Sequence, residues 1–224
     1  MKKILVPLIL LPFLFVLIRL LTNNYSYFYT IQEYIWVEIL INILPMLLFV
    51  AFDVYKNAKF SIIDTLIRSS FYVYLAYLLL FTIGYIPFAF IFTSNEFSID
   101  NINALRVNII PLKSYLVDSF IPLALYGNLI LLFPLGVYIA LLYNEKINKF
   151  ITVLSVLIIS SLLIETTQLI GTLLNQISGL YMYSRAFDVD DILLNVSGGI
   201  VGFLITRLLY SKIFKRVLNR DLIA

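Results

Sequence analysis

Histidine and cysteine are both absent from this chain of 224 residues. Without cysteine the chain can form no disulfide, no thiolate-bound zinc site and no thiol nucleophile. Without histidine it cannot be a Ser-His hydrolase, an HExxH metalloprotease or a His-ligated haem protein. Any chemistry that this protein performs must therefore rest on carboxylates, amides, hydroxyls or cationic side chains.

Charged residues are also scarce. They make up 13% of the chain, whereas 62% of the residues are hydrophobic and 16% are aromatic. Soluble domains carry about 25% charged residues. The composition therefore predicts an all-α protein, a polytopic bundle of membrane helices, and we expect no nucleic-acid partner.

A bilayer core about 30 Å thick is crossed by about 20 apolar residues in a helix. Six stretches of the sequence qualify as spans: 4–21, 35–52, 69–92, 119–143, 151–174 and 189–210. The first resembles a signal peptide in its position, but no small-x-small cleavage site follows it, so we expect a retained helix. Gly84 and Pro87 are expected to kink the third span.

The distribution of basic residues predicts the orientation. With the N-terminus inside, most of the sixteen Lys and Arg residues fall in cytoplasmic segments. The positive-inside rule then gives an N-in, C-in topology. The basic tail at 211–224 is either an anchor on anionic lipid or a plain stop-transfer flank.

Polar residues inside the predicted spans are the main candidates for function, because a charge at the bilayer centre costs about 2.5–3.5 kcal/mol on insertion scales. Glu165 and Gln168 lie three residues apart in the fifth span, hence on one helical face. Asn128 lies in the fourth span, and helix rise places it at a depth similar to that of Glu165.

The sixth span opens with a run of acidic residues. Asp188, Asp191 and Asn195 fall on one helical face, and Arg185 stands just before them. Asp190 is offset by about 100° and either points elsewhere or caps the helix. The polar groups of three spans are thus predicted to converge in the outer half of the membrane.

Gly198 and Gly202 continue the same helix and match the small-xxx-small pattern of closely packed membrane helices. Such packing is predicted to bring Glu165 or Asn128 of a neighbouring helix within reach of the acidic run.

Two interpretations of this polar cluster remain open. In the first it is a structural network, with Arg185 neutralising one aspartate and with Glu165 held by Gln168 or Asn128. In the second it is an outward-facing cavity that binds a ligand. Four acidic residues face one arginine, so a cation, an amine-bearing group or a protonated carboxyl must make up the difference.

These residues resemble the VanZ-like family of bacterial membrane proteins over roughly 105–210. The resemblance rests on Asn108 and Pro111, on Asn128 with Pro134-Leu135-Gly136, on Ser161-x-x-Ile164-Glu165-x-x-Gln168, and on Arg185-x-x-Asp188-x-Asp190-Asp191-x-x-x-Asn195-x-x-Gly198. Leu132 departs from the family, which usually has Phe two positions before the proline. The predicted organisation is an N-terminal three-helix region at 1–104 without a recognised motif, a VanZ-like domain at 105–210, and the tail.

The resemblance implies a multi-pass protein of the bacterial cell membrane. The namesake of the family lowers teicoplanin susceptibility by an unestablished mechanism, apart from the enzymes that remodel the D-Ala-D-Ala target. The hypothesis that follows is a protein that engages a membrane lipid, a lipid-linked envelope component or a lipoglycopeptide antibiotic. Teicoplanin carries an acyl chain and an amine, which suit an oily groove beside carboxylates.

Three alternatives stay open. The first is an enzyme acting on a membrane lipid or envelope precursor, in which carboxylates hold Mg²⁺ or act as acid and base. The second is a proton-coupled transporter that uses Glu165, and the third is a scaffold. The sequence shows no internal repeat, no known lipid-transferase signature and no GxGD motif. It assigns no metal ligand and no catalytic residue, and we expect no cofactor.

Overall fold

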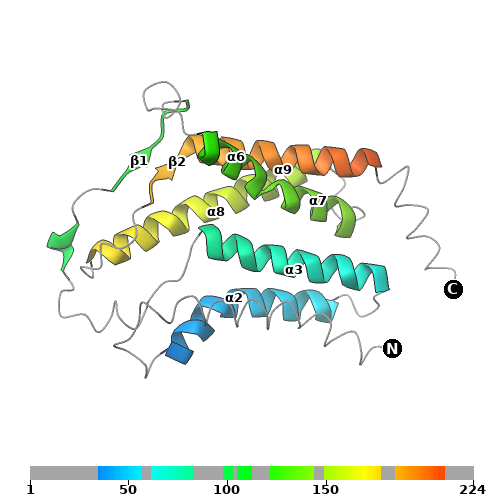
Figure 1. Ribbon diagram of the computed structural model, residues 1–224, viewed down its shortest axis with the longest axis horizontal. Helices are drawn as coiled ribbons and strands as arrows, with labels where there is room; N and C mark the ends of the chain where they lie inside the picture. The colour runs from blue at the N-terminus through cyan, green and yellow to red at the C-terminus, as the bar shows by residue number, and fades with distance from the viewer. Residues whose placement is uncertain are drawn as a thin grey trace. The chain divides into compact units, whose positions relative to one another are not determined.

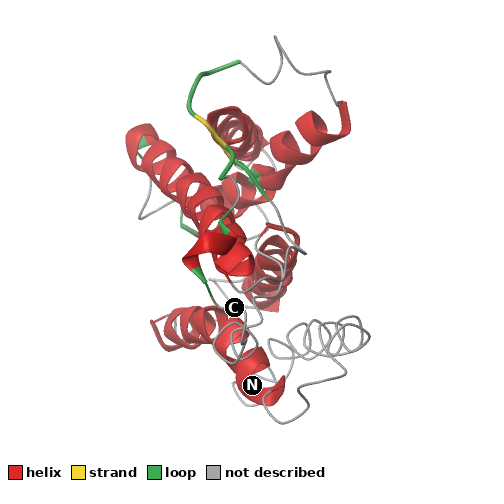
Figure 2. Cartoon of the chain, turned by 90° about the vertical axis from the view of Figure 1, so that its left-hand side faces the viewer, coloured by secondary structure: helices red, strands yellow, loops and turns green. Residues whose placement is uncertain are grey.

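A computed structural model of the protein describes residues 35–56, 62–82, 98–102, 105–112, 122–143, 149–177 and 185–209. Most of these residues lie in helices (Figure 2). The expected first span at 4–21, the kink at Gly84 and Pro87, and the basic tail lie outside the described residues. The chain divides into two compact units, one of Met1–Ala104 with Gly171–Ser184 and one of Leu105–Ile170 with Arg185–Ala224.

The first unit contains the neighbouring helices α2 (Ile35–Lys56) and α3 (Ile62–Thr82) (Figure 1). Helix α2 extends four residues beyond the predicted span, and α3 begins seven residues before the predicted start at 69. The early start of α3 was missed because Asp64 and Arg68 lie there. These two side chains are four residues apart and pair along the helix, so the charged segment remains helical.

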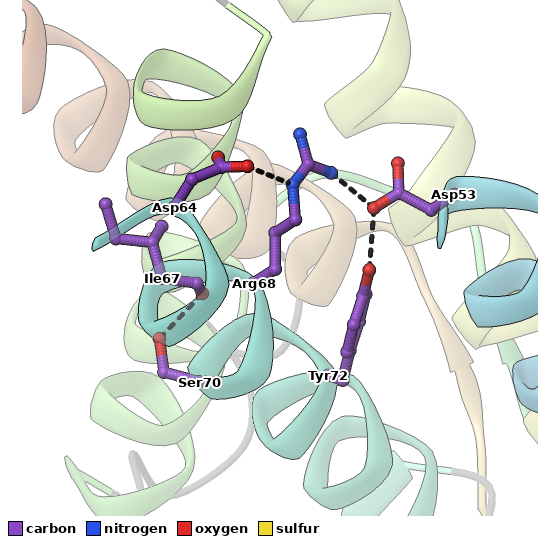
Figure 3. A network of polar contacts seen from close by, with 6 residues as sticks. All are labelled: Asp53, Asp64, Ile67, Arg68, Ser70 and Tyr72. Atoms are coloured by element: carbon purple, nitrogen blue, oxygen red, sulfur yellow. Dashed lines mark hydrogen bonds and ion pairs between the residues drawn. The ribbon is translucent and has the colours of Figure 1, made fainter. Parts of the chain in front are cut away.

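A buried polar network joins α2 to α3 (Figure 3). The Arg68 guanidinium donates to Asp53 on α2, and its Nε donates to Asp64 Oδ2 at 3.1 Å. The hydroxyl of Tyr72 also donates to Asp53, at 2.7 Å. Asp53, Arg68 and Tyr72 are all buried, and the ring of Phe49 meets the Tyr72 ring edge-on. The Asp64–Arg68 pair, four residues apart on α3, is therefore part of a larger network.

A short segment of the first unit closes the end of the long helix α8 (Phe150–Ile177). The backbone N–H of Ser98 and the side-chain amide of Asn101 both donate to the carbonyl of Ile177, at 2.9 and 3.3 Å. The last carbonyls of a helix lack partners within the helix, and these bonds supply them for Ile177. The 3₁₀ helix η2 (Ile99–Asn101) lies within this segment.

The second unit contains α6 (Pro122–Leu131), α7 (Phe133–Leu142), most of α8, and α9 (Val189–Leu209). The span predicted at 119–143 contains a segment long and apolar enough to cross a membrane, Leu125–Leu142, but the chain bends at Leu132, which separates α6 from α7. Pro134 explains the bend. It has no N–H for the carbonyl of Ile130, and its ring would collide with that carbonyl in a regular helix.

Helix α9 runs alongside α6 and α7 with the backbones in direct contact (Figure 1). A Cβ atom on Gly198, Gly202 or Gly136 would collide with the carbonyl oxygen of Leu129, Phe133 or Gly199, respectively. Each collision would be with backbone, which cannot move aside as a side chain can. The absence of side chains at these glycines is therefore what allows the close approach.

Two very short strands complete the second unit. Strand β1 (Val107–Asn108) pairs in parallel with β2 (Phe187–Asp188), with Asn108 opposite Asp188. The N–H of Phe187 also donates to the carbonyl of Arg106 at 3.0 Å. The sequence did not predict this pairing, which fastens the segment before α6 to the start of α9.

Three helical segments among the described residues are long and apolar enough to cross a membrane: Leu125–Leu142, Phe150–Ile177 and Val189–Leu209. The 28 residues of α8 extend for about 42 Å, which exceeds an apolar core of about 30 Å. The predicted total of six spans and the N-in, C-in topology stay predictions.

Candidate polar site at the start of helix α9

Asp188 stands at the centre of the predicted polar cluster, immediately before α9. Its Oδ1 accepts from the N–H of Asp190 at 2.8 Å, which is the N-cap bond of the helix. The same oxygen accepts from Asn108 Nδ2 at 2.8 Å, and the N–H of Asp188 donates to Glu165 Oε2 at 3.2 Å. One residue thus connects β1, α8 and α9.

Asp190 anchors the segment that follows β1. Its Oδ1 accepts from the N–H of Leu112 at 2.5 Å, and Asp190 is almost fully buried. Leu112 has a φ of 65°, in the left-handed region that non-glycine residues rarely adopt. The sequence allowed Asp190 to cap the helix, but the N-cap residue is Asp188. An N-cap residue must precede the first turn, and Asp190 lies within it.

Asp191 turns towards α6, where Asn128 Nδ2 donates to its Oδ1. Both residues are partly exposed. The approach of α6 at Gly198 brings the two helices close enough for this bond, since Leu129 is the neighbour of Asn128 in the chain.

A second polar layer lies between α8 and α9. Asn195 Nδ2 donates to Ser161 Oγ at 3.1 Å, and both residues have an exposed fraction of 0%. The other end of the amide, Asn195 Oδ1, is buried and has no hydrogen-bond partner.

The two helices follow an antiparallel register in steps of four residues. The facing positions are Glu165 with Asp191, Ser161 with Asn195, and Leu157 with Gly199. Moving four residues towards the end of α9 corresponds to moving four residues towards the start of α8. The next step, Val153 with Phe203, is also fully buried. The interface is therefore polar near the start of α9 and becomes apolar towards the end of α9.

Glu165 has an exposed fraction of 2%, and Gln168, one turn further along α8, is also buried. The Glu165 carboxylate interacts electrostatically with those of Asp188 and Asp191. Arg185, which is exposed, acts on both Glu165 and Asp191. Within the described part of the chain, the carboxylates of Glu165, Asp188 and Asp191 thus interact with one another and with Arg185.

Hydrogen bonds or electrostatic interactions join most of the predicted site residues into one cluster, and Gln168 lies buried beside it. The joined residues are Asn128, Glu165, Arg185, Asp188, Asp190 and Asp191, whereas Asn195 bonds to Ser161 in the adjacent layer. Two further members, Asn108 and Ser161, were noticed only as parts of motifs, and the backbone N–H of Leu112 was not anticipated. Backbone donors leave no trace in a side-chain pattern, so no signal could have revealed Leu112.

The cluster is rich in acceptors and suits a ligand that donates hydrogen bonds and carries positive charge. Among the residues that the structure describes, no group of three or more acidic side chains is arranged to hold a metal ion. Glu165 and Asp191 face each other from different helices, which suits general acid-base chemistry as well as the binding of a cation.

A family model described as VanZ/LLP1 matches residues 70–210, more than half of the chain. The match includes all the residues of the polar cluster and begins ahead of the motifs in the sequence. No curated protein and no solved structure matches the chain. The match confirms the resemblance seen in the motifs: this chain belongs to the VanZ-like family and, with three helical segments in its described part that are long and apolar enough to cross a bilayer, is a membrane protein.

Proposed function

We propose that the polar cluster is an outward-facing ligand site in a multi-pass protein of the bacterial cell membrane. It engages a lipid-linked envelope component or a lipoglycopeptide and thereby lowers susceptibility to teicoplanin. The observation that carries the proposal is the facing pair of carboxylates, Glu165 on α8 and Asp191 on α9, at the end of a packed helix interface.

Charge supports a binding role. Among the described residues, Glu165, Asp188, Asp190 and Asp191 contribute four carboxylates, and Arg185 is a cation that acts on Glu165 and Asp191. Buried charge is costly unless it is compensated, and more so in a membrane. A positively charged ligand would stabilise the cluster, whereas a purely structural network gains nothing from an excess of one sign.

The surroundings suit an amphiphile. The segment that follows β1 carries Ile109, Ile110 and Leu112, and all three side chains are exposed. The same segment is bonded to the site through Leu112 and Asp190. An apolar segment of this kind beside carboxylates can accept an acyl chain while the polar group enters the cluster.

The test compares teicoplanin and vancomycin susceptibility of one host strain with empty vector, wild type, Glu165→Gln or Asp191→Asn. Asp100→Asn is the matched control, because Asp100 is an exposed carboxylate on η2, outside the cluster. Immunoblots of membrane fractions verify equal protein levels.

Protection against teicoplanin by the wild type and by Asp100→Asn, lost in both cluster variants, would support the proposal. Protection that survives both cluster variants would show that the carboxylates are dispensable. A wild type that gives no protection would remove the antibiotic from the proposal.

A further inference from the structure

The unpartnered oxygen of Asn195 narrows down the ligand. Asn195 is fully buried, and its Nδ2 donates a hydrogen bond to Ser161 Oγ. Its Oδ1 is buried without a hydrogen-bond partner. Leaving a buried acceptor unsatisfied costs about 1–3 kcal/mol, so this oxygen is expected to meet a donor that the protein itself does not provide.

The position of this oxygen relates it to the carboxylates. Asn195 lies one turn beyond Asp191 on α9, and its partner Ser161 lies one turn before Glu165 on α8. The amide therefore occupies the layer next to Glu165 and Asp191 in the same interface. Three acceptors from two helices lie within one turn of one another.

The asparagine amides of the site are already engaged as donors. Each of its three asparagine amides donates to a side-chain oxygen of the protein: Asn108 to Asp188, Asn128 to Asp191, and Asn195 to Ser161. A ligand that satisfies the remaining acceptors, the carboxylates of Glu165 and Asp191 and the Oδ1 of Asn195, must carry several hydrogen-bond donors and a positive charge.

Among common cationic groups, a primary ammonium fits best. It offers three N–H donors, one for each of the three acceptors. A quaternary ammonium has no N–H and would leave Asn195 Oδ1 unsatisfied. A divalent metal ion is disfavoured because no group of three acidic side chains in the described residues is suited to hold one.

We infer that the site recognises the protonated primary amine of an amphiphile, held by Glu165, Asp191 and the Oδ1 of Asn195. The inference rests on the proposed function and names the chemical class of its ligand. The amine can come from an aminophospholipid of the membrane or from a lipoglycopeptide, since both join a primary ammonium to acyl chains.

The experiment uses the full-length protein in nanodiscs of phosphatidylglycerol with added phosphatidylethanolamine or phosphatidylcholine of identical acyl chains. Native mass spectrometry measures how much of each added lipid the protein retains. The two lipids differ only in the methylation of the amine, so the ratio of retained lipids reports recognition of its N–H groups. We expect the wild type to prefer phosphatidylethanolamine by about tenfold. A ratio of this size corresponds to one hydrogen bond from a charged group that phosphatidylcholine cannot make.

Variants assign the preference to this site. Asn195→Leu should abolish it, whereas Asn195→Asp, which keeps an acceptor, should retain it. Ser197→Leu is the matched control, because Ser197 lies on the exposed side of α9 two residues away. Equal retention of the two lipids by the wild type, or a preference that persists in Asn195→Leu, would overturn the lipid form of the inference.

A second arm tests the antibiotic as the source of the amine, by titrating the protein with teicoplanin and with teicoplanin acetylated at its amine. Weaker binding of the acetylated compound assigns the site to the antibiotic. If neither arm distinguishes the free amine while Glu165→Gln still loses protection, the amine inference fails and the proposed function stands. If a lipid preference appears without protection, the role against the antibiotic fails and the amine inference stands.

Discussion

Replacing Arg68 by methionine should strongly destabilise the α2–α3 pair. Arg68 compensates the buried carboxylate of Asp53 and also pairs with Asp64. Removing one member of a buried ion pair costs about 3–5 kcal/mol, because the other charge stays buried. The side chain of Asp64 is 28% exposed, so its own pairing is worth at most about 1 kcal/mol. The expected loss therefore comes almost entirely from Asp53.

The free energy of unfolding can be measured by titrating the purified protein with SDS in mixed micelles and following helicity by circular dichroism. The set comprises Arg68→Met, Asp53→Asn, Asp64→Asn and the double variant Asp53→Asn/Arg68→Met. Asp53→Asn keeps an oxygen that can accept from Tyr72, so it should cost less than Arg68→Met.

The double variant should be more stable than the sum of the two single effects predicts, with a coupling of about 0.5–3 kcal/mol. Removing both charges avoids the buried, uncompensated carboxylate that the single arginine variant leaves. The reasoning is refuted if Arg68→Met costs no more than Asp64→Asn, or if the two effects simply add.

Four further variants probe the second unit by the same unfolding assay. Gly136→Val should prevent assembly of the α7–α9 pair, because a Cβ there would meet the backbone oxygen of Gly199. Gly127→Ala is the control: nothing lies within 4 Å of the added atom, so it should be neutral or stabilising by up to about 1 kcal/mol. Leu112→Gly should leave stability unchanged or raise it slightly, since glycine adopts a positive φ without strain and keeps the N–H; a clear loss would mean that the side chain matters more than the backbone. Asn108→Ala should cost about 1–2 kcal/mol through the lost side-chain bond to the cap residue Asp188, and an unchanged midpoint would show that this bond contributes nothing.

Composition and hydropathy predicted a helical membrane protein because a span needs only length and apolarity, and α8 and α9 begin and end within three residues of the predicted limits. The break at Leu132 could have been foreseen from Pro134, but the run is apolar on both sides of it, so hydropathy alone predicts one uninterrupted span. The parallel pairing of Asn108 with Asp188 was beyond reach, since two residues of strand carry no periodic signal.

Helical spacing was sufficient to place the candidate site residues on shared faces, but not to say which partners they take. Spacing put Asp188 and Asp191 together, yet Asp188 meets Glu165 through its backbone N–H and Asp191 meets Asn128 through its side chain. Partners depend on the approach of a second helix, which is a tertiary property. For the same reason Asp64 could be paired with Arg68 from the sequence, whereas Asp53, on another helix, could not.

The four-residue register between α8 and α9 explains how an acidic group can be kept inside a membrane helix pair. The lower steps, Leu157 with Gly199 and the buried Val153 and Phe203, are apolar and closely packed. Asn195 and Ser161 lie at the boundary between the apolar and the acidic parts of the interface. There Asn195 Nδ2 donates to Ser161 Oγ, and Asn195 Oδ1 has no hydrogen-bond partner. The carboxylates of Glu165 and Asp191 are therefore not the only contact between the two helices, since Leu157 also lies against Gly199.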